Sequence, residues 1–235
     1  MRVRPISITQ ALPGAIPGHP SDVSPEALIV YKARVSSPEN QVKHLNGPRL
    51  LAFCIRHKHW SPFEMVDLTM EIETSRAIAA QILRHRSFSF QEFSQRYSAV
   101  ARLGDLVEPV EMRETHVDGN RQGSGGNIGS RPIPHASYSV DEIAASAVRH
   151  AEQAYRELLS AGVAPECARM VLPLATRTRL YMKGSVRSWI HYFQVRCDGH
   201  AQKEHRQVAE AIRMEFNLLF PTIALALAPA EPTQP

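Results

Sequence analysis

The densest group of polar side chains in the sequence lies in residues 84–97, which read RHRSFSFQEFSQRY. Three arginines share this segment with one glutamate, and four aromatic residues among them would hold it against the core. Arginines held near a core need carboxylate or phosphate partners, and Glu92 alone cannot pair with three of them. A solvated, charged helix end is the plainer interpretation, but the aromatic residues argue against it. The segment therefore predicts binding of anionic ligands.

The spacing within this segment resembles the signature of the flavin-dependent thymidylate synthase family. That signature reads Arg-His-Arg, two residues, Ser, one residue, Asn-Glu, one residue, Ser, one residue, Arg. The matching positions are Arg84, His85, Arg86, Ser89, Glu92, Ser94 and Arg96. Gln91 stands where the family usually has Asn, a change that keeps the amide and adds a methylene group.

Three further stretches resemble elements of the same family, in the same order. Residues 59–64, HWSPFE, resemble its His-x-Ser/Thr-Pro-Phe-Glu element, and residues 168–173, ARMVLP, resemble its Ala-Arg-x-x-Leu-Pro element. A predicted helix over residues 185–196, followed by Asp198 and His200, resembles its C-terminal flavin and nucleotide helix. Ser185 replaces the Asn that is usual there. The resemblance covers residues 25–220.

The resemblance implies an enzyme that methylates dUMP to dTMP and releases tetrahydrofolate. FAD is the implied cofactor, and NADPH and methylenetetrahydrofolate are the implied co-substrates. The residues implied to bind FAD are Ser61, Arg84, His85, Arg86, Glu92, Ser185, Val186, Arg187 and His191. Those implied to bind dUMP are Gln81, Ile82, Leu83, Arg84, Glu92, Phe93, Ser94, Gln95, Arg96, Arg169 and Arg196. Arg196 matches the catalytic residue credited with activating the pyrimidine, and the resemblance further implies a homotetramer whose active sites are shared between subunits.

These residue types suit that chemistry. Uracil reacts poorly until its ring is polarised, and an arginine stays charged at any working pH. An arginine against the imide edge of the ring favours negative charge there, while the flavin carries the redox step. On the predicted helix, Arg187 and His191 are four residues apart and share a face. Arg196, nine residues after Arg187, points the opposite way.

Two other functions remain open on the residues alone. A basic nucleic-acid-binding module would use the arginines that alternate with aromatic residues, namely Arg84, Arg86, Arg96, Arg177 and Arg179. A net charge of only +4 and the lack of a nucleic-acid motif argue against it. The second alternative is a catalytically inactive, flavin-binding homologue.

Two sharper chemical interpretations are not favoured. His57, His59, Cys197 and His200 do not have the spacing of a metal motif, so we expect no metal site. No base is implied beside Ser94, so we expect it to hydrogen-bond the nucleotide and not to act as a nucleophile.

Hydrophobic periodicity and capping residues predict an α+β fold, a single domain of the flavin-dependent thymidylate synthase type with mixed helices around a mainly antiparallel sheet. Helices are predicted over residues 25–34, 38–57 with a break near Gly47, 76–86, 140–159, 165–170, 185–196 and 201–220. Strands are predicted over residues 6–12, 63–74, 106–112 and 174–182. Residues 88–97 are predicted to be an ordered loop, 113–137 a mobile loop and 221–235 a disordered tail, which leaves 1–220 as the catalytic domain.

Composition places few other limits on the protein. With 235 residues, of which 43% are hydrophobic, the chain can form one substantial core. Three cysteines without a disulfide spacing favour a reducing compartment, and we expect a cytoplasmic protein because no signal peptide or membrane span is evident. Neither nucleic acid nor a membrane is an expected partner.

Overall fold

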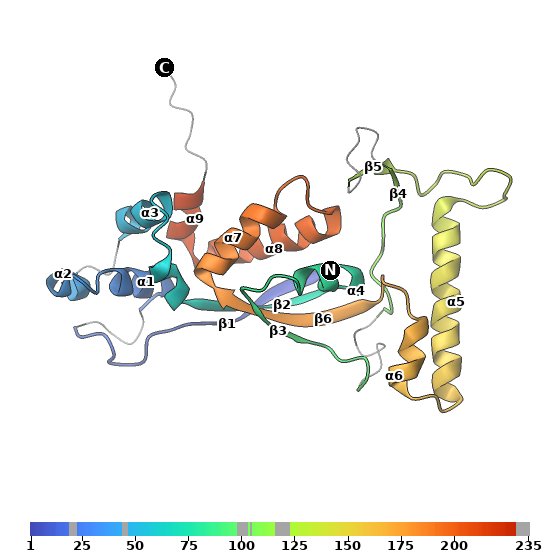
Figure 1. Ribbon diagram of the computed structural model, residues 1–235, viewed down its shortest axis with the longest axis horizontal. Coiled ribbons are helices and arrows are strands. Elements are labelled where there is room, and N and C mark those ends of the chain that lie inside the picture. The colour runs from blue at the N-terminus through green and yellow to red at the C-terminus, as the bar shows by residue number, and fades with distance from the viewer. Residues whose placement is uncertain (19–22, 44–46, 98–102, 104, 116–122, 229–235) are drawn as a thin grey trace, which may run out of the picture.

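The computed structural model describes residues 1–18, 23–43, 47–97, 103, 105–115 and 123–228. These residues confirm the predicted α+β class, with helices packed on an antiparallel sheet (Figure 1). The main sheet has the order β1-β2-β6-β3, formed by β1 (Arg2–Ile8), β2 (Asp67–Ser75), β6 (Arg177–Ser185) and β3 (Ser89–Glu92). A second, two-stranded sheet consists of β4 (Arg113–Thr115) and β5 (Ser124–Asn127).

The helices surround this sheet unevenly. They are α1 (Pro25–Ala33), α2 (Pro38–Lys43), α3 (Pro48–Arg56), α4 (Arg76–Ile82), α5 (Val140–Ser160), α6 (Pro165–Ala168), α7 (Val186–Arg196), α8 (Lys203–Leu219) and α9 (Pro221–Leu227), with 3₁₀ turns at Ser61–Met65 and Arg169–Val171. α7 and α8 lie over one face of the main sheet, whereas α5 stands beside the sheet and packs against α6 (Figure 1).

The core lies between the sheet and the helices above it. β2 and β6 pair along their full lengths, from Asp67 opposite Ser185 to Ser75 opposite Arg177. Alternate residues of β2, such as Met70 and Ile72, are fully buried on the helical side. The opposite face is polar and carries side-chain ion pairs, which join Arg4 to Glu71 at 2.8 Å and Arg179 to Glu73 at 2.5 Å.

Serine side chains begin four of the helices, as the sequence predicts. The hydroxyl groups of Ser24, Ser75 and Ser185 accept hydrogen bonds from backbone N–H groups in the first turns of α1, α4 and α7. Ser139 forms a complete capping box with Glu142 at the start of α5. The starts of α4 and α7 matter most for the site, because each follows directly from a central strand.

Several predicted boundaries of strands, and one of a helix, were wrong. β1 begins at Arg2 and ends at Ile8, so the predicted strand over residues 6–12 is displaced; as an edge strand, β1 tolerates Pro5, which has no N–H group to donate. Residues 61–65 form a 3₁₀ turn, so the strand predicted from residue 63 begins at Asp67. β6 covers residues 177–185 and not 174–182, and the helix predicted to reach residue 86 ends at Ile82.

Three segments take a structure of a different kind from the prediction. Residues 89–92, predicted to be a loop, form β3, which gains its hydrogen bonds from the edge of β6. Residues 106–112, predicted to be a strand, form only an isolated bridge between Val107 and Thr176. The segment 113–137, predicted to be a mobile loop, contains the paired strands β4 and β5, although its residues 116–122 lie outside the described residues.

The C-terminal segment also differs from the predicted disordered tail. Pro221 begins α9, whose Ile223 is fully buried. The backbone N–H of Ile223 donates to the Glu26 carboxylate at 2.8 Å, so α9 is fastened to α1. Alanine and leucine favour the helix, and burial against the neighbouring helices stabilises it. Residues 229–235 lie outside the described residues.

Candidate functional site

The Arg-His-Arg segment runs alongside α7. Arg196 Nε donates to His85 Nε2 at 2.9 Å near the end of α7. Near its start, Ser188 Oγ donates to the carbonyl oxygen of Ser87 at 3.3 Å. Residues 84–88 therefore lie antiparallel to the helix, which brings the predicted flavin segment and the predicted catalytic arginine into direct contact.

Phe88 anchors this segment to the core. Its side chain is buried, and its ring centroid lies 4.8 Å from that of Trp189 in an edge-on arrangement. The ring also crosses Gly184 of β6 so closely that a Cβ atom added there would lie 2.4 Å from Phe88 Cδ1. Only glycine permits this approach, so a residue of the central sheet sets the position of the turn.

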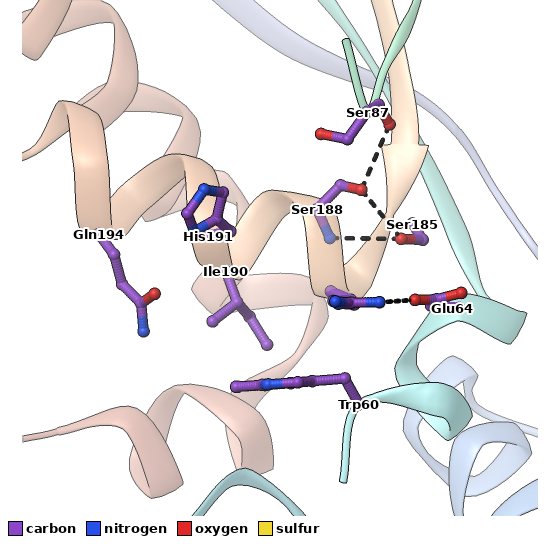
Figure 2. A pocket seen from close by; sticks show the side chains of 9 residues that line it. Trp60, Glu64, Ser87, Ser185, Ser188, Ile190, His191 and Gln194 are labelled. Atoms are coloured by element: carbon purple, nitrogen blue, oxygen red, sulfur yellow. Dashed lines mark hydrogen bonds and ion pairs between the residues drawn. The ribbon is translucent and has the colours of Figure 1, made fainter. Parts of the chain in front are cut away.

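A cavity of about 580 Å³ opens beside this contact. Figure 2 shows Ser188, His191 and Gln194 projecting from α7, with Trp60 facing Ile190 from the 3₁₀-turn side. The lining residues are Trp60, Glu64, Ser87, Ser185, Arg187, Ser188, Ile190, His191 and Gln194. An ion pair between Arg187 and Glu64 joins the helix to the 3₁₀ turn.

The cavity contains part of the predicted flavin set. Ser185 lines it, as do Arg187 and His191, which the sequence places on one helix face, and Arg196 does not. Ser61 is exposed on the neighbouring 3₁₀ turn and is not among the lining residues, while Val186 is fully buried in the core.

The sequence prediction missed six lining residues, namely Trp60, Glu64, Ser87, Ser188, Ile190 and Gln194. Trp60 and Glu64 lie within the HWSPFE element, so their neighbourhood was identified although no role was assigned to them. Ser188 and Gln194 fall on the same face of α7 as Arg187 and His191, so helical spacing from those residues was the signal that could have found them.

The Arg-His-Arg segment combines two exposed arginines with a half-buried histidine. Arg84 and Arg86 are exposed, and neither has an ion-pair partner within the described ranges of the chain. Burial, reinforced by the nearby Arg196 and His191, lowers the pKa of His85 from its ordinary value of 6.5 to about 4. His85 is therefore neutral at physiological pH, as its Nε2 must be to accept from Arg196.

A second group of predicted substrate residues gathers at the other end of α4. Arg76 and Thr178 both donate to Glu92 Oε1, each at 2.9 Å. Glu92 thus pairs with Arg76, an arginine outside its own segment. The reason is that Arg76 begins α4 beside the start of β6, next to β3. Arg96 Nε instead lies 3.3 Å from Glu166.

A smaller cavity of about 250 Å³ adjoins this second group. Arg76, Gln95 and Arg169 line it together with Met170, Leu172, Pro173, Leu174 and Thr176. The Gln95 side chain is buried, and its Nε2 atom has no hydrogen-bond partner within the described residues. A buried amide without a partner is costly, so this cavity suits a ligand with a hydrogen-bond acceptor.

The two groups lie at opposite ends of one helix. Arg76 begins α4 and Gln81 lies in its last turn, so the seven residues of α4 separate the groups by about 10 Å along the axis. No hydrogen bond or ion pair within the described residues joins them. The remaining predicted substrate residues are dispersed: Ile82 is core, Phe93 is half-buried, and Leu83 and Ser94 are exposed.

Comparisons with known proteins identify the family of this chain. The sequence profile of the family described as "Thymidylate synthase complementing protein" matches residues 21–222. A flavin-dependent thymidylate synthase from Synechocystis is 52% identical over 227 residues, which cover 97% of this chain and 99% of the relative. The chain belongs to the flavin-dependent thymidylate synthase family. A probable member from Paramecium bursaria Chlorella virus 1 is 44% identical over 86% of this chain and 90% of its own length.

A solved structure supports the family fold. The UMP/dUMP methylase PolB from Streptomyces cacaoi, bound with 5-Br dUMP, superimposes with a TM-score of 0.75 at 27% sequence identity. The match covers 96% of this chain and 93% of the other. The mixed helices and antiparallel sheet described above are therefore the architecture of the family.

The two departures from the family pattern, Gln91 in the signature and Ser185 before the C-terminal helix, have clear local settings. Ser185 Oγ accepts from Ser188 N at 3.3 Å, so serine performs the N-cap role that asparagine also fills well. Gln91 is exposed on β3, where it lies opposite Tyr181 of β6.

The structure also bears on metal binding and on membrane-spanning helices. Within the described residues, no cluster of three or more His, Cys, Asp and Glu side chains is placed to hold a metal ion. The same residues include no helix with the length and hydropathy needed to cross a bilayer.

Proposed function

We propose that this chain is a flavin-dependent thymidylate synthase, which methylates dUMP to dTMP with FAD as cofactor. Methylenetetrahydrofolate supplies the carbon unit and leaves as tetrahydrofolate, and NADPH supplies the reducing equivalents. The observation that carries the proposal is the contact between the Arg-His-Arg segment and Arg196 beside the cavity on α7. The names of the relatives and the 5-Br dUMP bound to the Streptomyces protein support the same function.

The residues at this cavity suit FAD. Arg84 and Arg86 do not line it, but they are exposed in the segment that reaches it through Ser87, and their guanidinium groups suit the anionic pyrophosphate. Trp60 and Ile190 provide apolar surface in the cavity, and Arg187 and His191 provide polar atoms. When bound, the flavin supplies the redox chemistry of the methylation.

The contacts of Arg196 support its proposed role in activating the pyrimidine. Its Nε atom is held by His85, which leaves both Nη nitrogens without a hydrogen bond inside the described part of the chain. Those nitrogens are available to the imide edge of dUMP, where a fixed positive charge favours negative charge on the ring. Because His85 is neutral, it orients Arg196 without adding a second charge.

The separation of the two groups along α4 supports an active site shared between subunits. Arg196 and Gln81 lie at one end of α4, and Gln95 and Arg169 lie by the cavity at the other. A homotetramer in which one subunit supplies the pyrimidine end and another supplies the phosphate end would join them. We propose this arrangement, in a cytoplasmic protein that acts on neither nucleic acid nor membranes.

A turnover assay tests the function. Purified protein should bind FAD and should oxidise NADPH when dUMP and methylenetetrahydrofolate are supplied. It should form dTMP only when both are present. Flavin binding without dTMP would identify an inactive homologue. Salt-dependent oligonucleotide binding without flavin affinity would favour the nucleic-acid alternative.

Subunit mixing tests the shared site. Alone, Arg196→Ala should be inactive, and Arg169→Ala should be strongly impaired at a dUMP concentration well below its raised KM, which is the concentration used for the mixing test. If one site uses these two residues from different subunits, random co-assembly restores about a quarter of the wild-type sites. Light scattering should show four subunits. No recovery of activity in co-assembled protein would contradict the shared site.

A further inference from the structure

Behind the pyrimidine end of the site, hydrogen bonds connect five side chains in series. Tyr192 Oη lies 3.1 Å from His205 Nε2, and His205 Nδ1 lies 3.1 Å from Gln81 Oε1. Gln81 Nε2 lies 2.6 Å from Gln202 Oε1, and Gln202 Nε2 lies 2.9 Å from Glu204 Oε2. The series runs from the buried Tyr192 and His205 to the exposed Gln202. We refer to these five residues as the α8 relay.

The carboxylate of Glu204 fixes one end of the α8 relay as an acceptor. Arg113 of β4 forms an ion pair with Glu204 at 2.6 Å. Burial alone would raise the pKa of Glu204, but hydrogen bonds from Arg113 and Gln202 lower it below its ordinary value. An ionised carboxylate has no hydrogen to donate, so Gln202 must be the donor in their contact.

This end determines the direction of every other hydrogen bond in the relay. Because Gln202 donates through Nε2, its Oε1 faces Gln81 and requires a donor there. Gln81 must therefore present Nε2 to Gln202 and Oε1 to His205. A neutral imidazole has one N–H group, so His205 donates through Nδ1 and accepts through Nε2 from the Tyr192 hydroxyl.

The surroundings of His205 keep it in that single neutral form. It is fully buried, and burial together with nearby Arg196 and His85 lowers its pKa from 6.5 to about 3. The buried Tyr192 hydroxyl remains protonated, since burial raises its pKa. Neither end of the relay can therefore reverse its polarity at physiological pH.

We infer that the α8 relay holds the Gln81 amide in one orientation, so that its second Nε2 hydrogen faces a carbonyl oxygen of the bound pyrimidine. That hydrogen has no partner in the described part of the chain, because Gln202 uses only the first. A free glutamine would sample both orientations, and in the other it would turn its oxygen toward the ligand. His205 is then a positioning residue that acts through Gln81. The inference rests on the proposed function, since the family resemblance places Gln81 at dUMP.

Two substitutions of His205 separate this role from simple packing. His205→Gln keeps one donor and one acceptor, whereas His205→Phe keeps the ring and removes both. The dissociation constant of dUMP is measured by calorimetry on the FAD-loaded protein. His205→Phe should weaken dUMP binding about tenfold, the effect of losing one oriented hydrogen bond, while His205→Gln should stay within about threefold of wild type. Tyr192→Phe removes only the hydrogen bond that fixes the tautomer of His205, so its dissociation constant for dUMP should lie between those of the two His205 variants.

A double-mutant cycle tests whether His205 acts through Gln81. In a Gln81→Ala background, His205→Phe should have no further effect on dUMP binding, because the group that it orients is absent. Glu210 is a carboxylate on α8 outside the relay, so Glu210→Gln is the matched control. This variant should bind dUMP as the wild type does. Circular dichroism and retained FAD binding establish that each variant is folded.

The outcomes distinguish this inference from the proposed function. Additive effects of His205→Phe and Gln81→Ala, or better dUMP binding by His205→Phe than by His205→Gln, would overturn the relay while leaving the enzyme intact. If His205→Phe does not fold, Tyr192→Phe takes its place in the cycle. It should weaken dUMP binding in the wild-type background and have no further effect in the Gln81→Ala background. A wild-type protein that forms no dTMP would instead refute the proposed function.

Discussion

Protein stability should fall steeply as the pH drops below neutral, because His85 and His205 are buried in their neutral forms. Their pKa values are lowered to about 4 and about 3, whereas a histidine in the unfolded chain keeps its ordinary value of 6.5. The unfolded chain therefore takes up protons first as the pH falls. Stability contributed by the neutral imidazoles is complete above pH 6.5 and is lost progressively between 6.5 and the folded-state values.

The size of the loss follows from these values. Between about pH 7.5 and about pH 5, a group with pKa 6.5 when unfolded and about 3 when folded loses about 2 kcal/mol of stability. Over this interval the result hardly depends on the folded-state value, provided that it stays below about 4. His85 is partly exposed, so solvent screening makes its contribution smaller than that of His205.

Urea unfolding at the two pH values, at one fixed protein concentration, measures this loss. His205→Gln cannot ionise, so its free energy of unfolding should fall by about 2 kcal/mol less than that of the wild type over the same interval. His57→Gln removes an exposed histidine and should behave as the wild type does. A His205→Gln protein with the wild-type pH dependence would refute the claim that His205 is held neutral.

Three further predictions concern the site itself. Gly184→Ala should displace Phe88 and the turn that it anchors, which should lower the free energy of unfolding by about 1–3 kcal/mol and weaken FAD binding. Gly199→Ala is the control and should do neither, because a Cβ there meets nothing within 4 Å. Thermal unfolding and FAD titration check both variants. Arg196→Ala should abolish dTMP formation while FAD still binds, and wild-type turnover would remove Arg196 from the mechanism. Arg169→Ala should raise the KM for dUMP more than it lowers kcat, because it removes a binding contact and not the activating charge; an unchanged KM would place dUMP elsewhere.

The sequence predicts best those features that depend on neighbouring residues. Ser75 and Ser185 were identified as helix caps because a cap needs only its own first turn. The site segment was found because the spacing of its charged residues is local. β3 was missed because its four residues become a strand only by pairing with β6, which lies almost ninety residues later in the chain.

Long-range pairing also explains what was missed within the site. Glu92 alone was predicted to be unable to pair with all the arginines of its own segment, and the folded chain brings Arg76, from outside that segment, to it. His205 falls on the buried stripe of α8, where a lone histidine resembles any other core residue in the sequence. Its role becomes visible only when Gln81 and Tyr192, 124 and 13 residues away, are brought to its two ring nitrogens.

The joint between β6 and α7 explains why the site lies where it does. Ser185 is both the last residue of the central strand and the cap of α7, so the helix starts at a position fixed by the sheet. From that start, helical geometry alone assigns one face of α7 to the core, through Trp189 and Tyr192, and another to the cavity, through His191. Asparagine and serine are both strong caps, so replacing one by the other keeps this start unchanged. The departure from the family pattern at residue 185 thus preserves the feature on which the placement of Arg196 depends.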